Sequence, residues 1–138
     1  MDVKRINDKV SVSPQISPDD VAAIKAAGFT TIVNNRPDGE APDQPASAVM
    51  EAAAKAAGLA YFYIPLGRDG VTSAMVDKTV EALEGSTGPV FCYCRSGTRS
   101  TTLWALSQAG KLPAQDIVQA AAHAGYDMSH LLGHLSQK

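Results

Sequence analysis

Residues 90–100 read VFCYCRSGTRS and carry the strongest fold signal in the chain. Residues 90–93 are apolar or aromatic and predict a buried strand, whereas 98–109 predict a helix. Gly97 lies between them and permits the backbone angles that turn several N–H groups inward. In an open parallel sheet, such a loop lies at the carboxyl end of a strand, where ligands bind. The stretch therefore predicts an anion-binding loop that leads into a helix.

Short strands and helices alternate in the rest of the chain. A hairpin is predicted from residues 3–6 and 9–13, and further strands at 30–33 and 61–64. Further helices are predicted at 18–27, 46–57, 72–83, 113–123 and 129–136. Strands separated by helices of ten or more residues imply crossover connections. We therefore expect one α/β domain over residues 1–138, with three layers and a mainly parallel central sheet of four to five strands flanked by helices.

Composition and charge exclude several function classes. The 138 residues carry a net charge of −2, without the basic excess of a nucleic-acid-binding surface. No apolar run approaches the roughly 18 residues of a membrane span, and the N-terminus does not resemble a signal peptide. The only two cysteines, Cys92 and Cys94, lack a nearby histidine partner for zinc. We expect a reduced, cytoplasmic protein without a metal or cofactor, and with neither nucleic acid nor membrane as a partner.

The residue types in the loop favour nucleophilic catalysis by Cys94. A helix N-terminus and the planar fork of Arg99 suit an oxyanion, and the same positive field favours the thiolate form of Cys94. Ser100 is predicted to donate a hydrogen bond to that thiolate or to stabilise it as a leaving group. The side chain of Arg95 points either to the anion or to solvent. If it points to solvent, the backbone N–H of Arg95 binds the anion instead. The predicted anion-binding residues of the loop are Arg95, Ser96, Gly97, Thr98 and Arg99.

A second motif, NNRPDGE at residues 34–40, follows another predicted strand. The carboxyl end of that strand is expected at the same edge of the sheet as Cys94. Asn35 is a candidate to brace the catalytic loop, and Arg36 to add positive potential. The alternative is that the segment is an ordinary turn, in which asparagine side chains cap the backbone, Pro-Asp-Gly forms the turn and Arg36 is solvated.

The CRSGTRS and NNRPDGE motifs together resemble the bacterial β-lactamase-hydrolase-like family with a phosphatase-like fold. The resemblance extends from residue 6 to about 126. It implies the fold of the dual-specificity and tyrosine phosphatases, a central parallel sheet flanked by helices. Members of the family stand alone or are fused to a metallo-β-lactamase-type persulfide dioxygenase. We expect a stand-alone domain, with a persulfide dioxygenase as a partner.

The spacing between Cys94 and Arg99 bears on the reaction. Tyrosine-phosphatase-like enzymes place five residues between these positions, usually with His before the Cys. Here four residues lie between them and Tyr93 precedes the cysteine. Rhodanese-type sulfurtransferases typically have the shorter loop, and a narrower cradle suits a single persulfide sulfur better than a phosphoryl group. The primary expectation is therefore a rhodanese-type sulfurtransferase that forms a Cys94 persulfide.

Two alternatives stay open. The first is a phosphomonoester phosphatase of the tyrosine- or dual-specificity-like kind, with a phosphocysteine intermediate. It requires a general acid, for which Asp69 is the candidate, although an aspartate before Gly70 is also a common turn residue. The second alternative is a non-catalytic anion-binding or sulfur-carrier module. In each case the expected ligand is a small sulfur-containing or phosphorylated molecule.

Other reactive side chains have simpler interpretations. Cys92 shares the face of Cys94 and is either a core residue, which we favour, or a resolving thiol. His130 and His134 have a spacing that can bind metal, but no third ligand is evident, and surface positions are expected.

Overall fold

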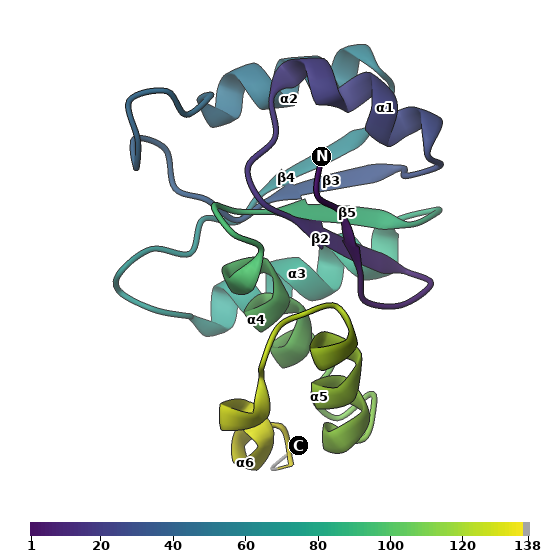
Figure 1. Ribbon diagram of the computed structural model, residues 1–138, viewed down its shortest axis with the longest axis vertical. Coiled ribbons are helices and arrows are strands. Elements are labelled where there is room, and N and C mark those ends of the chain that lie inside the picture. Colours follow the sequence, from purple (N-terminus) through teal and green to yellow (C-terminus); the bar gives the residue numbers. More distant parts are fainter. Residues whose placement is uncertain (137–138) are drawn as a thin grey trace.

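The computed structural model describes residues 1–136, and its strands form one five-stranded sheet in the order β1-β2-β5-β3-β4 (Figure 1). β1 pairs antiparallel with β2, and every other neighbouring pair is parallel. The predicted α/β class with a mainly parallel sheet is confirmed. The strands span Lys4–Arg5 (β1), Val10–Ser13 (β2), Thr31–Asn34 (β3), Ala60–Tyr63 (β4) and Val90–Tyr93 (β5).

The helices lie close to their predicted positions. The predicted helix at 18–27 begins with a 3-10 turn, Pro18–Asp20, in which Asp20 accepts a hydrogen bond from the Ser17 N–H (2.8 Å). The predicted helix at 129–136 is a 3-10 turn, Ser129–Leu131, followed by one α-helical turn that contains the weak helix former Gly133. The α-helices are α1 (Val21–Ala26), α2 (Ser47–Ala56), α3 (Ser73–Gly85), α4 (Thr98–Ser107), α5 (Ala114–His123) and α6 (Leu132–Leu135).

The helices form layers on both faces of the sheet (Figure 1). α1 and α2 cover one face, α3 and α4 cover the other, and α5 and α6 lie beyond α4. Because side chains alternate along a strand, β5 contributes to both cores. Phe91 and Tyr93 pack toward α1 and α2, whereas Cys92 packs in the same core as Trp104 of α4. Cys92 is a buried core residue, as favoured from the sequence.

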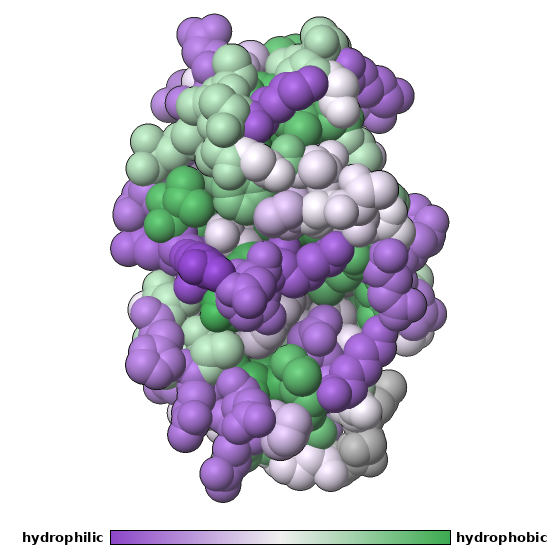
Figure 2. All heavy atoms as spheres, turned by 90° about the vertical axis from the view of Figure 1, so that its right-hand side faces the viewer, coloured by the Kyte–Doolittle hydropathy of each residue, from purple (hydrophilic) through white to green (hydrophobic). Residues whose placement is uncertain are grey.

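The carboxyl ends of β2, β3, β4 and β5 meet at one edge of the sheet, on the left in Figure 1. The loops at 35–46, 64–72 and 94–97 leave the sheet at this edge. Figure 2 shows the opposite side of the molecule, where hydrophilic side chains are dispersed among apolar ones. The parallel topology therefore brings both sequence motifs to one edge.

Within residues 1–136, no helix combines the length and apolarity that crossing a bilayer requires. The same residues contain no group of three or more His, Cys, Asp or Glu side chains placed to hold a metal ion. His130 and His134 are exposed.

Candidate active site

Cys94 is the first residue after β5, and its side chain is completely buried. The backbone N–H of Gly97 donates to Cys94 Sγ (3.0 Å), while the Cys94 N–H donates to the Ser13 carbonyl of β2 (3.3 Å). α4 begins at Thr98, and the N–H groups of its first turn, next to this loop, have no intrahelical acceptors. The start of α4 and the Gly97 N–H therefore present hydrogen-bond donors and the positive end of the helix dipole at this position.

The backbone of the loop requires glycine at position 97 for two reasons. Gly97 has φ of 94°, a left-handed conformation that costs other residues free energy. A Cβ there would also lie 2.1 Å from the hydroxyl oxygen of Tyr126. Burial raises the pKa of Tyr126, so its hydroxyl stays protonated and donates to the Ser96 carbonyl (2.9 Å). Tyr126 thus holds the loop from the α5 side.

The remaining side chains of the loop divide into exposed and buried ones. Arg95 is exposed, in agreement with the alternative in which its N–H rather than its guanidinium faces the anion. Ser96 Oγ donates to Thr98 Oγ1 (3.1 Å), so these two hydroxyls hydrogen-bond each other. Ser100 is buried, and its Oγ has no hydrogen-bond partner within residues 1–136. That hydroxyl is available to a thiolate or a bound ligand.

Glu40 holds the guanidinium of Arg99 from the second motif. Arg99 Nη1 donates to Glu40 Oε2 (2.7 Å) and Nη2 donates to Oε1 (2.9 Å), while Nη1 also donates to the Leu66 carbonyl (2.9 Å). Three of the five guanidinium N–H groups are thereby used, which leaves two for Cys94 or an oxyanion. Hydrogen bonds from Arg99 and Arg36 outweigh burial and lower the pKa of Glu40 from 4.5 to about 2. Glu40 in turn raises the pKa of Arg99.

Arg36 is buried, so the interpretation of Arg36 as a solvated turn residue is wrong. Its Nε donates to Glu40 Oε1 (2.9 Å), and its Nη1 donates to Gln15 Oε1 (3.0 Å). The Gln15 N–H then donates to the Arg95 carbonyl (3.3 Å). Arg36 needs these partners because a buried charge without them is costly. The chain of contacts from Arg95 to Arg99 braces both ends of the Cys94 loop.

Asn35 joins two strand ends beside Cys94. Its N–H donates to the carbonyl of Tyr93, the residue before Cys94 (2.8 Å), and its Nδ2 donates to the Ile64 carbonyl (2.9 Å). The following loop is fixed at Asp38, whose N–H donates to the hydroxyl oxygen of Tyr63 (2.9 Å). The NNRPDGE segment therefore supports the Cys94 loop through hydrogen bonds.

Asp69 lies exposed in a turn between Gly67 and Gly70, closed by a hydrogen bond from the Gly70 N–H to the Gly67 carbonyl (3.2 Å). The same loop begins at Leu66, whose carbonyl accepts from Arg99. Asp69 thus belongs to a segment anchored at Arg99, and its carboxylate is accessible.

Sequence reasoning missed three residues of this arrangement, Gln15, Glu40 and Tyr126. Glu40 is the last residue of the NNRPDGE motif, and a partly buried arginine needs an acidic partner, which could have indicated its role. Gln15 and Tyr126 act through single hydrogen bonds to the loop backbone, and their sequence surroundings carry no comparable signal.

The family profile described as "Beta-lactamase hydrolase-like protein, phosphatase-like domain" matches residues 2–111. The chain belongs to this family. A β-lactamase hydrolase-like protein of Agrobacterium fabrum is 35% identical over 130 residues, which are 93% of this chain and 30% of the relative. The chain spans about a third of the length of the curated relatives it matches.

Solved structures agree with membership of the β-lactamase hydrolase-like family. A "putative phosphatase" from Neisseria meningitidis superimposes with a TM-score of 0.83 at 28% identity, covering 99% of this chain and 98% of that one. PTPMT1 superimposes with a TM-score of 0.70 at 18% identity, covering 98% of this chain and 94% of that one, and shows a shared fold. The predicted phosphatase-like fold is confirmed. The comparisons support the phosphatase alternative rather than the sulfurtransferase expected from the spacing.

Proposed function

We propose that this domain is a cysteine-dependent phosphatase that hydrolyses phosphomonoesters through a phosphocysteine on Cys94. The observation that carries the proposal is the Arg99 fork: Glu40 and Leu66 fix it at the loop, and two N–H groups remain for an oxyanion. The membership of a phosphatase-like family supports phosphate as that anion.

In the first step, the Cys94 thiolate attacks phosphorus, an S–P bond forms, and the bond between phosphorus and the leaving oxygen breaks. The two remaining Arg99 N–H groups and the N–H groups at the start of α4 hold the non-bridging oxygens. These donors are fixed before the reaction by Glu40 and by the backbone of Gly97. The site therefore stabilises charge without having to reorganise.

Asp69 is proposed to protonate the leaving oxygen and then to accept a proton from the water that attacks the phosphocysteine. In that second step the S–P bond breaks and the Cys94 thiolate leaves, stabilised by a hydrogen bond from Ser100. An exposed acid on a loop anchored at Arg99 has the freedom to approach the leaving group. Asp69→Asn is expected to slow alkyl phosphates more than p-nitrophenyl phosphate, because nitrophenolate leaves without protonation. Equal slowing of both substrates would show that Asp69 is not the acid.

Sulfur transfer is the second candidate, because the four-residue spacing between Cys94 and Arg99 makes a short loop. The thiolate would attack the outer sulfur of thiosulfate, releasing sulfite, and the resulting persulfide would pass its sulfur to cyanide. The same groups would stabilise the thiolate, so the two activities must be separated by assay.

The test measures p-nitrophenyl phosphate hydrolysis and thiosulfate–cyanide turnover with one preparation. We expect phosphate release that Cys94→Ser abolishes, and that Cys92→Ala retains because Cys92 is a core residue two positions away. Arg99→Lys is expected to lower kcat/KM by about 100-fold, since lysine cannot reproduce the fork. Turnover of thiosulfate without phosphate release would overturn the proposal in favour of sulfur transfer.

A further inference from the structure

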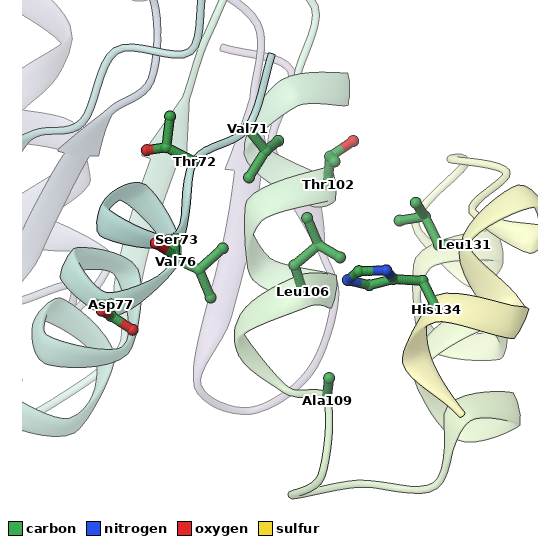
Figure 3. Close-up of a pocket in the computed structure, with 10 residues that line it drawn as sticks. All are labelled: Val71, Thr72, Ser73, Val76, Asp77, Thr102, Leu106, Ala109, Leu131 and His134. Atoms are coloured by element: carbon green, nitrogen blue, oxygen red, sulfur yellow. The ribbon is translucent and has the colours of Figure 1, made fainter. Parts of the chain in front are cut away.

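An apolar groove lies between α3, α4 and α6, with a volume of about 570 Å³. Figure 3 shows its lining, with Val71 and Val76 on one side, Leu106 of α4 in the middle, and Leu131 and His134 on the other. A volume of several hundred Å³ with mainly apolar walls is typical of small-molecule sites. The groove was not anticipated from the sequence.

α4 links the groove to the Cys94 loop, because the helix begins at the loop and contributes two residues to the groove lining. Thr98, Thr102 and Leu106 recur every four residues, so they lie on one face of the helix. Thr98 belongs to the loop, and Thr102 and Leu106 line the groove. The hydroxyl of Thr102 donates to the Thr98 carbonyl (3.0 Å), so its hydrogen-bonding capacity is engaged within the helix. The near end of the groove lies one helical turn, about 6 Å, from the loop.

The groove wall opposite α4 is also connected to the Cys94 site. Val71 and Thr72 line the groove and directly follow the segment at 66–70, which carries Asp69 and contacts Arg99. The groove continues along α4 from Thr102 to Leu106, about 6 Å of helix axis, and reaches Ala109 just beyond the helix. Within residues 1–136, its lining contains no lysine or arginine, and its ionisable side chains are Asp77 and His134. It therefore offers contact to an apolar chain and neither a guanidinium nor an ammonium group to a second anion.

We propose that the groove binds the alkyl chain of a phosphomonoester whose phosphate lies in the Cys94 loop. The inference rests on the proposed function for the position of the phosphate, and it adds the substrate class. Alkyl phosphates are preferred over short or highly polar phosphomonoesters because the chain is removed from water along α4. A fully buried methylene improves binding by a factor of about four. Because the groove is open on one side, each methylene is expected to improve binding by only about twofold.

The test is calorimetric binding of ethyl phosphate and octyl phosphate, below its micelle concentration, to the Cys94→Ser protein, which binds without turnover. Six additional methylenes are expected to strengthen binding on the order of 50-fold. Val71→Asp places a charge in the groove wall at an exposed position and is expected to reduce this ratio to a few-fold. Because both ligands carry the same anion, any general effect of the new charge on phosphate affinity cancels in the octyl-to-ethyl affinity ratio.

Val49→Asp is the matched control, since Val49 is an exposed valine of α2 on the other face of the sheet. It is expected to leave the ratio unchanged. The groove proposal would be overturned if ethyl and octyl phosphate bound with equal affinity, or if neither ligand bound. It would also be overturned if Val71→Asp and Val49→Asp reduced the octyl-to-ethyl affinity ratio equally. If octyl phosphate binds more tightly as expected but wild-type protein releases no phosphate from p-nitrophenyl phosphate, the proposed function fails and the groove stands.

Discussion

Replacing Glu40 with glutamine tests whether this carboxylate positions Arg99. The change keeps the size of the side chain but removes the negative charge between two arginines. Three hydrogen bonds of 2.7 to 2.9 Å lose their charged acceptor. The Arg36 side chain is only 6% exposed and keeps Gln15 as its other hydrogen-bond partner. The variant therefore leaves a buried cation poorly compensated.

The magnitude follows from burial. Breaking a fully buried ion pair by removing one partner costs about 3–5 kcal/mol. The Glu40 and Arg99 side chains are 29% and 26% exposed, so solvent screens part of the effect. We expect Glu40→Gln to lower the free energy of unfolding by about 2–3 kcal/mol near neutral pH. Glu51→Gln is the matched control, because the exposed pair of Glu51 with Lys55 is worth less than about 0.5 kcal/mol.

The pH dependence gives a second, independent signature. The pKa of Glu40 is about 2 in the folded protein, below its ordinary 4.5. A lowered folded-state pKa stabilises the protein above the ordinary pKa, and this stabilisation is lost as the pH falls toward the folded-state value. The stability difference between wild type and Glu40→Gln is therefore expected to be constant above about pH 5 and to shrink between 4.5 and 2.

Urea denaturation across this pH range, together with p-nitrophenyl phosphate kinetics, measures both effects. We expect kcat/KM of Glu40→Gln to fall about 10- to 100-fold, less than for loss of an entire oxyanion donor. A Glu40→Gln protein as stable as Glu51→Gln, or a stability difference independent of pH, would refute the reasoning. Tighter phosphate binding by Glu40→Gln would show that Glu40 competes with the anion rather than positioning Arg99.

Two further predictions concern the loop itself. Gly97→Ala is expected to cost at least 1–2 kcal/mol from the positive φ, and more from the contact with Tyr126, with at least a tenfold loss of phosphatase activity. Gly133→Ala, where a Cβ meets nothing within 4 Å, is its control in thermal denaturation, and equal effects of the two would contradict the account. Ser100→Ala removes a buried hydroxyl that lacks a partner in the described residues, so it should slow thiolate departure and produce a burst of p-nitrophenol before the steady state. A uniform loss without a burst would place Ser100 in the first step or in the fold.

The strand, loop and helix around Cys94 were predictable because their signals are local. An apolar run, a glycine and a helical pattern occur within about twenty residues, and β5 and α4 begin at the predicted positions. The shared edge of the two motifs also followed, since parallel strands end on the same side. Sequence periodicity was sufficient for these features.

The pairing of Glu40 with Arg99 was not predictable in the same way, because 59 positions separate the two residues. It depends on β3 lying next to β5, an order that periodicity leaves undetermined. The burial of Arg36 was misjudged for a related reason: its polar partners come from the end of β2 and from the loop, and only the fold brings them together. The expected sulfur chemistry rested on residue spacing, which counts positions but does not describe the donors that surround Sγ.

The most direct test of the central claim is the covalent state of Cys94 during turnover. Wild-type protein is mixed with p-nitrophenyl phosphate, denatured within the first turnover and mapped by peptide mass spectrometry. A parallel sample is treated with thiosulfate. A phosphoryl group on Cys94 in the first sample, absent from Cys92, is the predicted result. An unmodified Cys94 in the phosphate sample, with an added sulfur on Cys94 after thiosulfate, would contradict it.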